Sequence, residues 1–189
     1  MKNRLAIFDM DGTLFDTVEA NYEAYKNAVM EVIGSCSIGL EEFKNKCFGK
    51  NYKYFLREIF NVNEALIEDI HDLKCLRYMK YAKKYVKENT FLFYVINEIK
   101  EKYYIALLTT ASAKNTYEIL KAYNKTEIFD LILTSDDVEN LKPDSEGILR
   151  AMNYFDVDAC KTIFFDDSED CVNMARDLGI DSYKIIAGR

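Results

Sequence analysis

The sequence predicts an α/β protein in which a parallel sheet is interrupted by an inserted helical segment. Short apolar runs of strand length alternate with helical patterns over most of the chain. Between residues 17 and 87 this alternation stops, and nearly every pattern is helical. Carboxylate residues follow directly after two of the apolar runs, at the edge of a parallel sheet where ligands bind.

The expected strands are short and rich in β-branched or aromatic residues, as buried strands are. They cover residues 5–8, 105–108, 131–133, 162–165 and, with a weaker pattern, 183–186. Helical patterns over residues 115–123, 145–154 and 168–178 lie between them, and the last of these stops at Gly179. Strands that alternate with helices of this length indicate βαβ crossovers, so we expect a Rossmann-like sheet covered on both faces.

The interrupting segment reads as a bundle of helices. Its first helix is expected to begin at Asp16 or Thr17 and to end at Gly34. Three more helical patterns follow over residues 40–48, 52–60 and 64–87. The sequence therefore predicts two domains: an α/β core of residues 1–16 plus 88–189, and a helical cap of residues 17–87.

Composition excludes several classes of function. A net charge of −7 argues against a nucleic-acid partner, which requires a basic face. His71 is the only histidine, so a histidine-rich metal site is excluded. The five cysteines form no CxxC pair, which is typical of free thiols in a reducing compartment. With no signal sequence and no long apolar run, we expect a cytoplasmic protein without a membrane partner.

The residues that could carry chemistry follow the apolar runs. The first run ends in Asp9, with Asp11 two residues later and Gly12 allowing the loop to bend close to an anion. The second run ends in Thr109 and Thr110, whose hydroxyl and N–H groups face the same edge. Lys142 follows the third run by several residues, and the pair Asp166–Asp167 ends the fourth. We expect all these groups to converge.

These charges form a consistent set. Several carboxylates at one point require a hard divalent cation, and oxygen ligands without histidine or thiolate favour Mg²⁺. Lys142, the hydroxyl of Thr109 and the loop N–H groups then complete a site for a phosphoryl group. A carboxylate nucleophile next to a carboxylic proton donor suits Asp9 and Asp11.

Four segments together resemble the haloacid dehalogenase-like superfamily in residues, order and spacing. FDMDGTLFDT at residues 8–17 is similar to its first motif and LLTTAS at 107–112 to its second. SDDVENLKPDS at 135–145 is similar to the third, and IFFDDSEDCVNMARDLGI at 163–180 to the fourth. The helical insertion resembles the small cap of the phosphoglycolate-phosphatase-like branch.

The resemblance implies roles for these residues. Asp9 would attack phosphorus and form an aspartyl-phosphate, and Asp11 would protonate the leaving oxygen and later activate water. Thr109, Thr110 and Lys142 would hold the phosphoryl group. Asp9, the Asp11 carbonyl, Asp167 and Asp166 would bind Mg²⁺. The implied function is hydrolysis of a small phosphorylated metabolite, and phosphoglycolate, a sugar phosphate and a nucleotide monophosphate all fit.

The sequence departs from the family pattern in the fourth motif and before the second strand. Asp166–Asp167 stands where many relatives have Gly-Asp or Glu-Asp, which leaves the division of metal binding between the two open. Cys171 stands where many have a carboxylate, with Asp170 one residue earlier. Residues 90–94 replace a common Pro-Gly turn, so the connection from the cap is expected to differ.

Substrate choice is expected to reside in the cap. In related enzymes the loop near Gly49 faces the active site, which makes a short stretch the candidate contact region: Lys50, Asn51, Tyr52 and Lys53. The alternative interpretation is a solvated turn.

Two other functions share part of this pattern. A phosphomutase would pass the phosphoryl group from Asp9 back to its substrate, which requires extra cap contacts for a second phosphate. A phospho-receiver or non-catalytic binding module also combines acidic residues, a threonine and Lys-Pro. Receivers, however, carry the phosphorylated aspartate after the third strand, and they have no helical insertion of this length.

Overall fold

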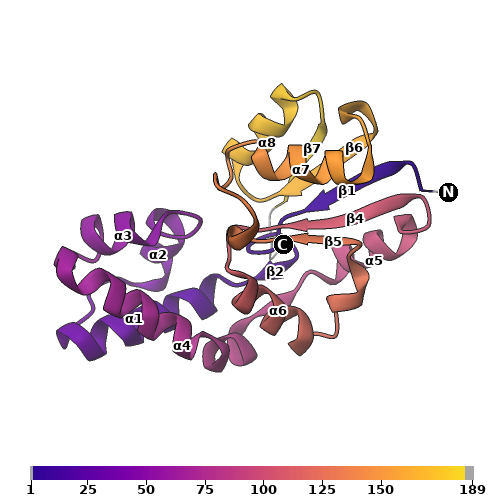
Figure 1. Ribbon diagram of the computed structural model, residues 1–189. Helices are drawn as coiled ribbons and strands as arrows, with labels where there is room; N and C mark the ends of the chain where they lie inside the picture. Colours follow the sequence, from indigo (N-terminus) through magenta and orange to yellow (C-terminus); the bar gives the residue numbers. More distant parts are fainter. Residues whose placement is uncertain (1, 186–189) are drawn as a thin grey trace. The chain divides into compact units, whose positions relative to one another are not determined.

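The computed structural model describes residues 2–185 and divides into two compact units (Figure 1). Unit 1 consists of Met1–Asp16 and Lys87–Arg189, and unit 2 is Thr17–Val86. Each unit has its own hydrophobic core, and each is described separately below.

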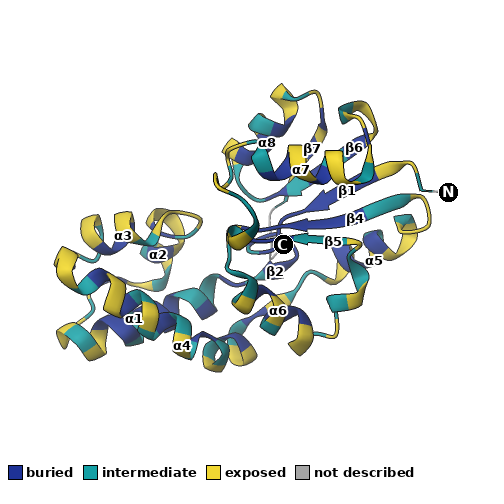
Figure 2. Ribbon diagram, viewed as in Figure 1, coloured by how far each residue is buried: buried dark blue, intermediate teal, exposed yellow. Residues whose placement is uncertain are grey.

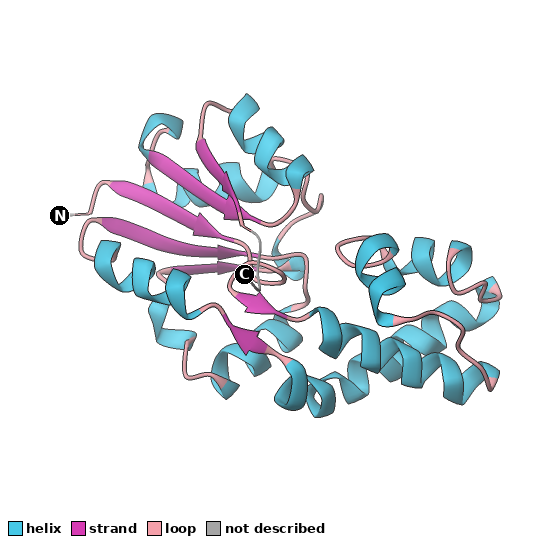
Figure 3. Cartoon of the chain, turned by 180° about the vertical axis from the view of Figure 1, so that it is seen from behind, coloured by secondary structure: helices cyan, strands magenta, loops and turns pink. Residues whose placement is uncertain are grey.

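Unit 1 is built on a parallel sheet of five strands in the order β5-β4-β1-β6-β7 (Figures 1 and 3). The strands are β1 Arg4–Phe8, β4 Tyr103–Leu108, β5 Leu131–Leu133, β6 Thr162–Asp166 and β7 Asp181–Lys184. The predicted fold class, a parallel α/β sheet with a helical insertion, is confirmed. The last strand begins two residues earlier than the weak pattern at 183–186 suggested, and residue 186 lies outside the described part.

Strand order places β1 at the centre of the sheet. The chain passes from β1 to β4 and β5 on one side, then crosses to β6 and β7 on the other. Phe8 pairs with Leu107 of β4 and with Phe165 of β6, so the three central strands end at the same level. Such a reversal of strand order opens a crevice at the carboxyl ends of the strands. Asp9 is the first residue after β1 at this point.

Four helices connect the strands of unit 1: α5 Thr90–Ile99, α6 Ala113–Ala122, α7 Glu146–Phe155 and α8 Glu169–Asp177. Short 3₁₀ turns occupy Thr126–Ile128, Ser135–Asp137 and Ala159–Lys161. Right-handed crossovers put α5 and α6 on one face of the sheet and α7 and α8 on the other (Figure 1). The sheet is thus covered on both faces, which explains why its strands are continuously apolar.

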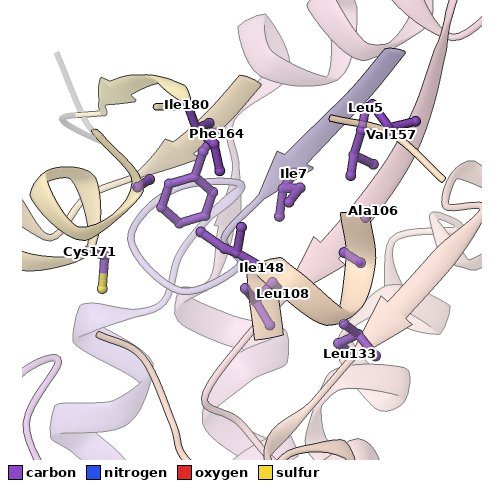
Figure 4. Close-up of a cluster of buried hydrophobic side chains, with 12 residues drawn as sticks. Leu5, Ile7, Ala106, Leu108, Leu133, Ile148, Val157, Phe164, Cys171 and Ile180 are labelled. Carbon is purple, nitrogen blue, oxygen red and sulfur yellow. The ribbon is translucent and has the colours of Figure 1, made fainter. Parts of the chain in front are cut away.

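The core of unit 1 is packed from alternating strand positions. Leu5 and Ile7 face α7 and α8, where Ile148 of α7 and Phe164 of β6 contribute to the same buried cluster (Figure 4). Figure 2 shows β1 as buried along most of its length. A strand buried on both faces is rigid, and it therefore delivers the residue at its end to a defined position.

A two-stranded antiparallel ribbon lies where the chain leaves unit 1 and returns to it. It pairs β2 Phe15–Asp16 with β3 Lys87–Glu88. Next to it, Asn89 caps α5 by accepting a hydrogen bond from the N–H of Leu92, and its own amide donates to the carbonyl of Thr13. Neither the ribbon nor α5 was expected from the sequence. Residues 90–94, which replace the common Pro-Gly turn, form the start of α5.

Unit 2 is helical throughout. Its helices are α1 Val18–Ile33, α2 Leu40–Lys46, α3 Tyr52–Glu58 and α4 Ile67–Tyr85, with a 3₁₀ turn at Glu64–Leu66. The helix predicted over 64–87 is thus a 3₁₀ turn followed by α4, and it ends at Tyr85 because Lys87–Glu88 forms β3. Thr17 is the N-cap of α1 and Gly34 ends it with φ 86°, so both expected ends of this helix are confirmed.

Long apolar faces hold unit 2 together. α1 packs along α4, and Phe43 of α2 and Phe55 of α3 complete a core that also contains Tyr25 and Ile70. In residues 2–185 no helix is both long and apolar enough to cross a membrane. All five cysteines are free thiols.

Candidate active site

Asp9 lies at the centre of the candidate site. The sheet hydrogen bond from its N–H to the carbonyl of Phe165, 2.9 Å, continues the pairing of β1 with β6 by one residue. Its side chain is buried, and its Oδ2 atom has no hydrogen-bond partner. A buried carboxylate oxygen without a partner is costly, so Oδ2 is a position where a ligand would be stabilising.

Lys142 joins the two central strand ends. Its Nζ donates to Oδ1 of Asp9 and to Oδ2 of Asp166, each at 2.6 Å. The lysine side chain is only 5% exposed. Burial alone would lower the pKa of Lys142, but the two carboxylates outweigh this and hold the pKa above its usual range. Lys142 is therefore a permanent cation between Asp9 and Asp166.

Negative charge exceeds this one cation. Asp9, Asp166 and Asp167 each offer a carboxylate oxygen within 4.8 Å of the others. Burial raises the pKa of Asp167 to about 6, and the charge of Asp166 adds to the effect. Burial also raises the pKa of Asp9 well above its usual range, against the opposing attraction of Lys142. Burial is the main cause of both shifts, and repulsion from the neighbouring carboxylates adds to it.

A divalent cation fits this group. Its donors are oxygen atoms only, which Mg²⁺ prefers. Asp9 also has a buried carboxylate oxygen, Oδ2, that makes no hydrogen bond. Asp166 is held for such a role, because its Oδ1 accepts from the N–H of Ser168 at 2.9 Å and its Oδ2 accepts from Lys142. The residues present therefore suit Mg²⁺, with Asp9, Asp166 and Asp167 as the side-chain ligands.

The loop after Asp9 turns tightly against this group. Gly12 has φ 87°, and its N–H donates to the carbonyl of Phe15 at 2.8 Å. A Cβ atom added at Gly12 would lie 2.4 Å from Oδ2 of Asp167. Glycine thus allows the backbone to approach the carboxylate of Asp167. Asp11 precedes this turn, half-buried, and its charge contributes to the raised pKa of Asp167.

Thr109 and Thr110 stand at the end of the neighbouring strand. The N–H of Thr109 continues the pairing of β4 with β5 by donating to Leu133, and its Oγ1 accepts from the N–H of Ala111 at 3.1 Å. Within residues 2–185 the N–H of Thr110 makes no hydrogen bond. Ser112 then caps α6 through Asn115, so the positive end of that helix follows directly.

One residue in this region was not singled out from the sequence. Oδ2 of Asp136 accepts from the N–H of Ala113, the first residue of α6, at 3.1 Å. The N–H of Ser135 donates to the carbonyl of Ala111. Asp136 thus fastens the loop after β5 to the turn that carries Thr109 and Thr110. The acidic pair Asp136–Asp137 within the third motif was the available signal.

The structure also places the two residues at which the fourth motif departs from the family pattern, Cys171 and Asp170. Cys171 is buried, and burial raises the pKa of its thiol to about 11, so it contributes a neutral group. Asp170 is exposed on the first turn of α8 and is not part of the carboxylate group.

The cap candidates all lie in unit 2 and have partners there. Asn51 caps α3 by accepting from the N–H of Lys53, and the Nζ of Lys53 pairs with Glu68 at 2.7 Å. Tyr52 donates to the same glutamate, and Lys50 lies over the ring of Tyr54. Within unit 1 the structure brings together Asp9, Gly12, Lys142, Asp166 and Asp167, and it places Thr109 and Thr110 at the end of the neighbouring strand β4.

Two named enzymes are similar to this chain in sequence over most of its length. The phosphorylated carbohydrates phosphatase of Thermotoga maritima is 28% identical over 182 residues, covering 93% of this chain and 81% of that protein. Pyrophosphatase PpaX of Bacillus mycoides is 24% identical over 172 residues, covering 89% of this chain and 76% of that protein.

A solved structure shows the same fold. The structure of a predicted phosphoglycolate phosphatase from Haemophilus somnus 129pt has a TM-score of 0.86 at 15% identity, covering 100% of this chain and 87% of that one. Residues 6–185 match the family described as haloacid dehalogenase-like hydrolase. The match spans both units, and the resemblance seen in the four motifs is confirmed. The chain belongs to the haloacid dehalogenase-like hydrolases.

Proposed function

We propose that this hydrolase is a Mg²⁺-dependent phosphatase that cleaves a small phosphate monoester through an aspartyl-phosphate on Asp9. One observation carries the proposal: Lys142 lies between Asp9 and Asp166, Asp167 joins these two residues in an all-oxygen group, and Oδ2 of Asp9 is buried without a hydrogen-bond partner. A carboxylate nucleophile needs such a cationic frame, because a phosphate dianion would otherwise repel it.

The residues of unit 1 suit the steps of this reaction. The hydroxyl of Thr109, the N–H of Thr110 and the ammonium of Lys142 bind phosphoryl oxygens. Asp9 attacks phosphorus, the ester oxygen leaves, and a bond between phosphorus and the Asp9 carboxylate replaces the ester bond. Asp9, Asp166, Asp167 and the Asp11 carbonyl would hold Mg²⁺, which would supply positive charge to offset that of the phosphoryl oxygens.

Asp11 is the proposed acid and base. In the first step it gives its proton to the leaving oxygen, and in the second it removes a proton from the water that hydrolyses the aspartyl-phosphate. The Asp11 position, two residues after Asp9 and before the Gly12 turn, suits a group that must reach the leaving oxygen.

The two parts of the chain have different proposed tasks. Residues 1–16 plus 88–189 perform the chemistry, and residues 17–87 select the substrate. Lys50, Asn51, Tyr52 and Lys53 are the proposed substrate contacts in the second part. Sequence relatives named as a phosphatase of phosphorylated carbohydrates and as a pyrophosphatase support a small phosphorylated metabolite as the substrate. Five free thiols suit a reducing compartment, so we place the reaction in the cytoplasm.

The test is hydrolysis of p-nitrophenyl phosphate and of a panel of phosphorylated metabolites, measured as free phosphate. We expect activity that requires Mg²⁺ and is abolished by EDTA. Asp9→Asn should reduce it to background, because the amide is not a nucleophile. Asp11→Asn should reduce it about 10²- to 10⁴-fold, the usual contribution of a general acid.

Asp170→Asn is the matched control, since it removes one exposed carboxylate of the same region, and its activity should equal that of the wild type. No phosphate release from any ester on the panel would contradict the proposal. Conversion of a sugar phosphate to an isomer without phosphate release would instead identify a mutase.

A further inference from the structure

The loop between β5 and α7 carries Lys142 and ends at Glu146. The carboxylate of Glu146 takes no part in the reaction described above. We propose that Glu146 is a positioning residue that holds the loop so that the Lys142 ammonium reaches both Asp9 and Asp166. The inference rests on the proposed function, because it assigns Glu146 a role through Lys142.

Glu146 is the first residue of α7, and its carboxylate reaches back over the loop. Oε1 accepts from the N–H of Glu139 at 2.9 Å. Oε2 accepts from the N–H of Asn140 at 2.8 Å and from its side-chain amide at 3.1 Å. One carboxylate thus satisfies three donors on two consecutive residues, two and three positions before Lys142.

Glu146 is held in its turn. Its own N–H donates to Oδ1 of Asp144 at 2.9 Å, and the N–H of Asp144 donates to the carbonyl of Leu141. These bonds flank Lys142 on both sides. The N–H groups of Glu139 and Asn140 lower the pKa of Glu146, as expected for a carboxylate that works in its ionised form.

Helix α7, which begins with Glu146, is fixed in the hydrophobic core of unit 1. Ile148 and Ala151 of α7 are fully buried in the core of unit 1. A continuous path of contacts therefore runs from the core through α7 and Glu146 to the loop, and from Lys142 to Asp9. Lysine has a long flexible side chain, so its ammonium is placed accurately only if the backbone at its base is fixed.

The other end of the loop has its own fastening. Thr134 donates from both its N–H and its hydroxyl to Oδ2 of Asp137, at 2.8 and 2.7 Å. Arg150 of α7 donates to the carbonyl of Asp137. Since these contacts lie at least four residues before Lys142, Glu146 is the side chain that binds the backbone immediately before the lysine, at Glu139 and Asn140.

A simpler role for Glu146 would be to stabilise the start of α7. Ser145, the N-cap residue, makes no side-chain capping bond, so an acidic residue in the first turn would favour the helix on its own. The two roles differ in their consequences. A helix-stabilising residue affects unfolding, whereas a positioning residue affects the turnover step through Lys142 and has no effect once Lys142 is gone.

The experiment is a double-mutant cycle on the phosphatase reaction with Glu146→Ala and Lys142→Met. We expect Glu146→Ala to lower kcat about 10- to 100-fold with little change in KM, the usual range for a displaced catalytic group. Glu146→Gln, which keeps one acceptor oxygen, should fall between Glu146→Ala and the wild type. The double variant should be no slower than Lys142→Met alone. Independent losses that multiply in the double variant would overturn the proposal.

A second measurement does not depend on turnover. Acetic anhydride modifies lysine amines at a rate that rises with exposure, and mass spectrometry reads the rate at each residue. Lys142 should be protected in the wild type and react at least several-fold faster in Glu146→Ala. Glu98→Ala is the control: Glu98 is exposed on α5 and its carboxylate forms no hydrogen bond or ion pair within residues 2–185, so Lys142 should stay protected.

Turnover and lysine labelling together test the positioning role of Glu146 separately from the proposed function. Unchanged labelling of Lys142 in Glu146→Ala would refute the positioning role even in an active enzyme. Absence of phosphatase activity in the wild type, together with faster labelling in Glu146→Ala, would refute the proposed function and leave the placement of Lys142 by Glu146 supported.

Discussion

The carboxylate of Asp9 at the end of β1 is repelled by the neighbouring carboxylates. Two carboxylates, those of Asp9 and Asp166, contact the single ammonium of Lys142, and the carboxylate of Asp167 lies within 4.8 Å of them. Removing one partner of a buried ion pair usually destabilises a protein by about 3–5 kcal/mol, because the other charge is left unpaired. The fold maintains this arrangement because the apolar strands on which Asp9 and Asp166 stand are buried.

Gly12 allows a direct test of how closely the loop must approach. In Gly12→Ala the new Cβ atom would lie 2.4 Å from Oδ2 of Asp167, so this carboxylate must move. We expect phosphatase activity to fall at least about 100-fold, since a misplacement of 1 Å can cost that much. The apparent affinity for Mg²⁺, measured from the metal dependence of the rate, should weaken as well.

Gly179→Ala is the matched control for backbone strain. Gly179 also has positive φ, 79°, but an added Cβ atom would meet nothing within 4 Å. Both variants should lose about 1–2 kcal/mol of stability from the left-handed conformation. Equal activity in the two variants would show that contact with Asp167 does not matter.

At the scale of elements, α4 carries the only histidine of the chain in a polar cluster inside unit 2. Nδ1 of His71 lies 2.8 Å from the hydroxyl of Tyr25, Nε2 lies 3.5 Å from Sγ of Cys75, and the ring of Tyr52 stacks on the imidazole. Burial lowers the pKa of His71, and the ammonium of Lys74 lowers it further. The helix pair α1 and α4 therefore packs around a neutral imidazole.

This environment predicts how the stability of the protein depends on pH. The folded protein takes up a proton on His71 less readily than the unfolded chain, whose histidine has a pKa of about 6.5. The free energy of unfolding should therefore decrease as the pH falls below about 6.5 and towards the lower pKa of the folded state. Urea unfolding between pH 5 and 7.5 measures this dependence.

His71→Asn removes the titrating group and supplies the comparison. Asp72 and Glu68 raise the pKa of His71 and Lys53 lowers it, and all three remain in the variant. The difference in unfolding free energy between wild type and variant should therefore shrink as the pH falls. A difference that stays constant across this range would rule out the expected role of the neutral imidazole.

At the scale of the molecule, the two units differ in what a metal does to them. The carboxylate group lies wholly in unit 1, and the hydrophobic core of unit 2 is separate. We expect Mg²⁺ to stabilise unit 1 by about 2.7 kcal/mol at a concentration 100-fold above its dissociation constant. Hydrogen exchange followed by mass spectrometry should be compared in Mg²⁺ and in EDTA. Addition of the metal should slow exchange more in unit 1 than in unit 2.

Asp167→Asn should reduce this stabilisation, because it removes one ligand, while Asp170→Asn should retain it in full. Equal slowing in both units, or the same response in Asp167→Asn as in the wild type, would argue against a metal at this group.

Much of unit 1 was predictable from local sequence. The runs that form β1, β4, β5 and β6 are apolar because both faces of the sheet are covered, and that pattern is visible without a structure. The weakest pattern was that of β7, an edge strand whose residues are mostly exposed. The β2–β3 ribbon could not be predicted, because its two strands have two residues each and their pairing joins residues about 70 positions apart.

The sequence by itself determined which groups could carry chemistry, since Asp9, Thr109 and Asp166 each follow or end an apolar strand and parallel strands end at one edge. Only the tertiary structure decided how these groups meet. The bridge of Lys142 between two carboxylates, the contact of Gly12 with Asp167 and the reach of Glu146 over its loop depend on the paths of loops. Loop paths follow from long-range packing and hydrogen bonds, and no local pattern encodes them.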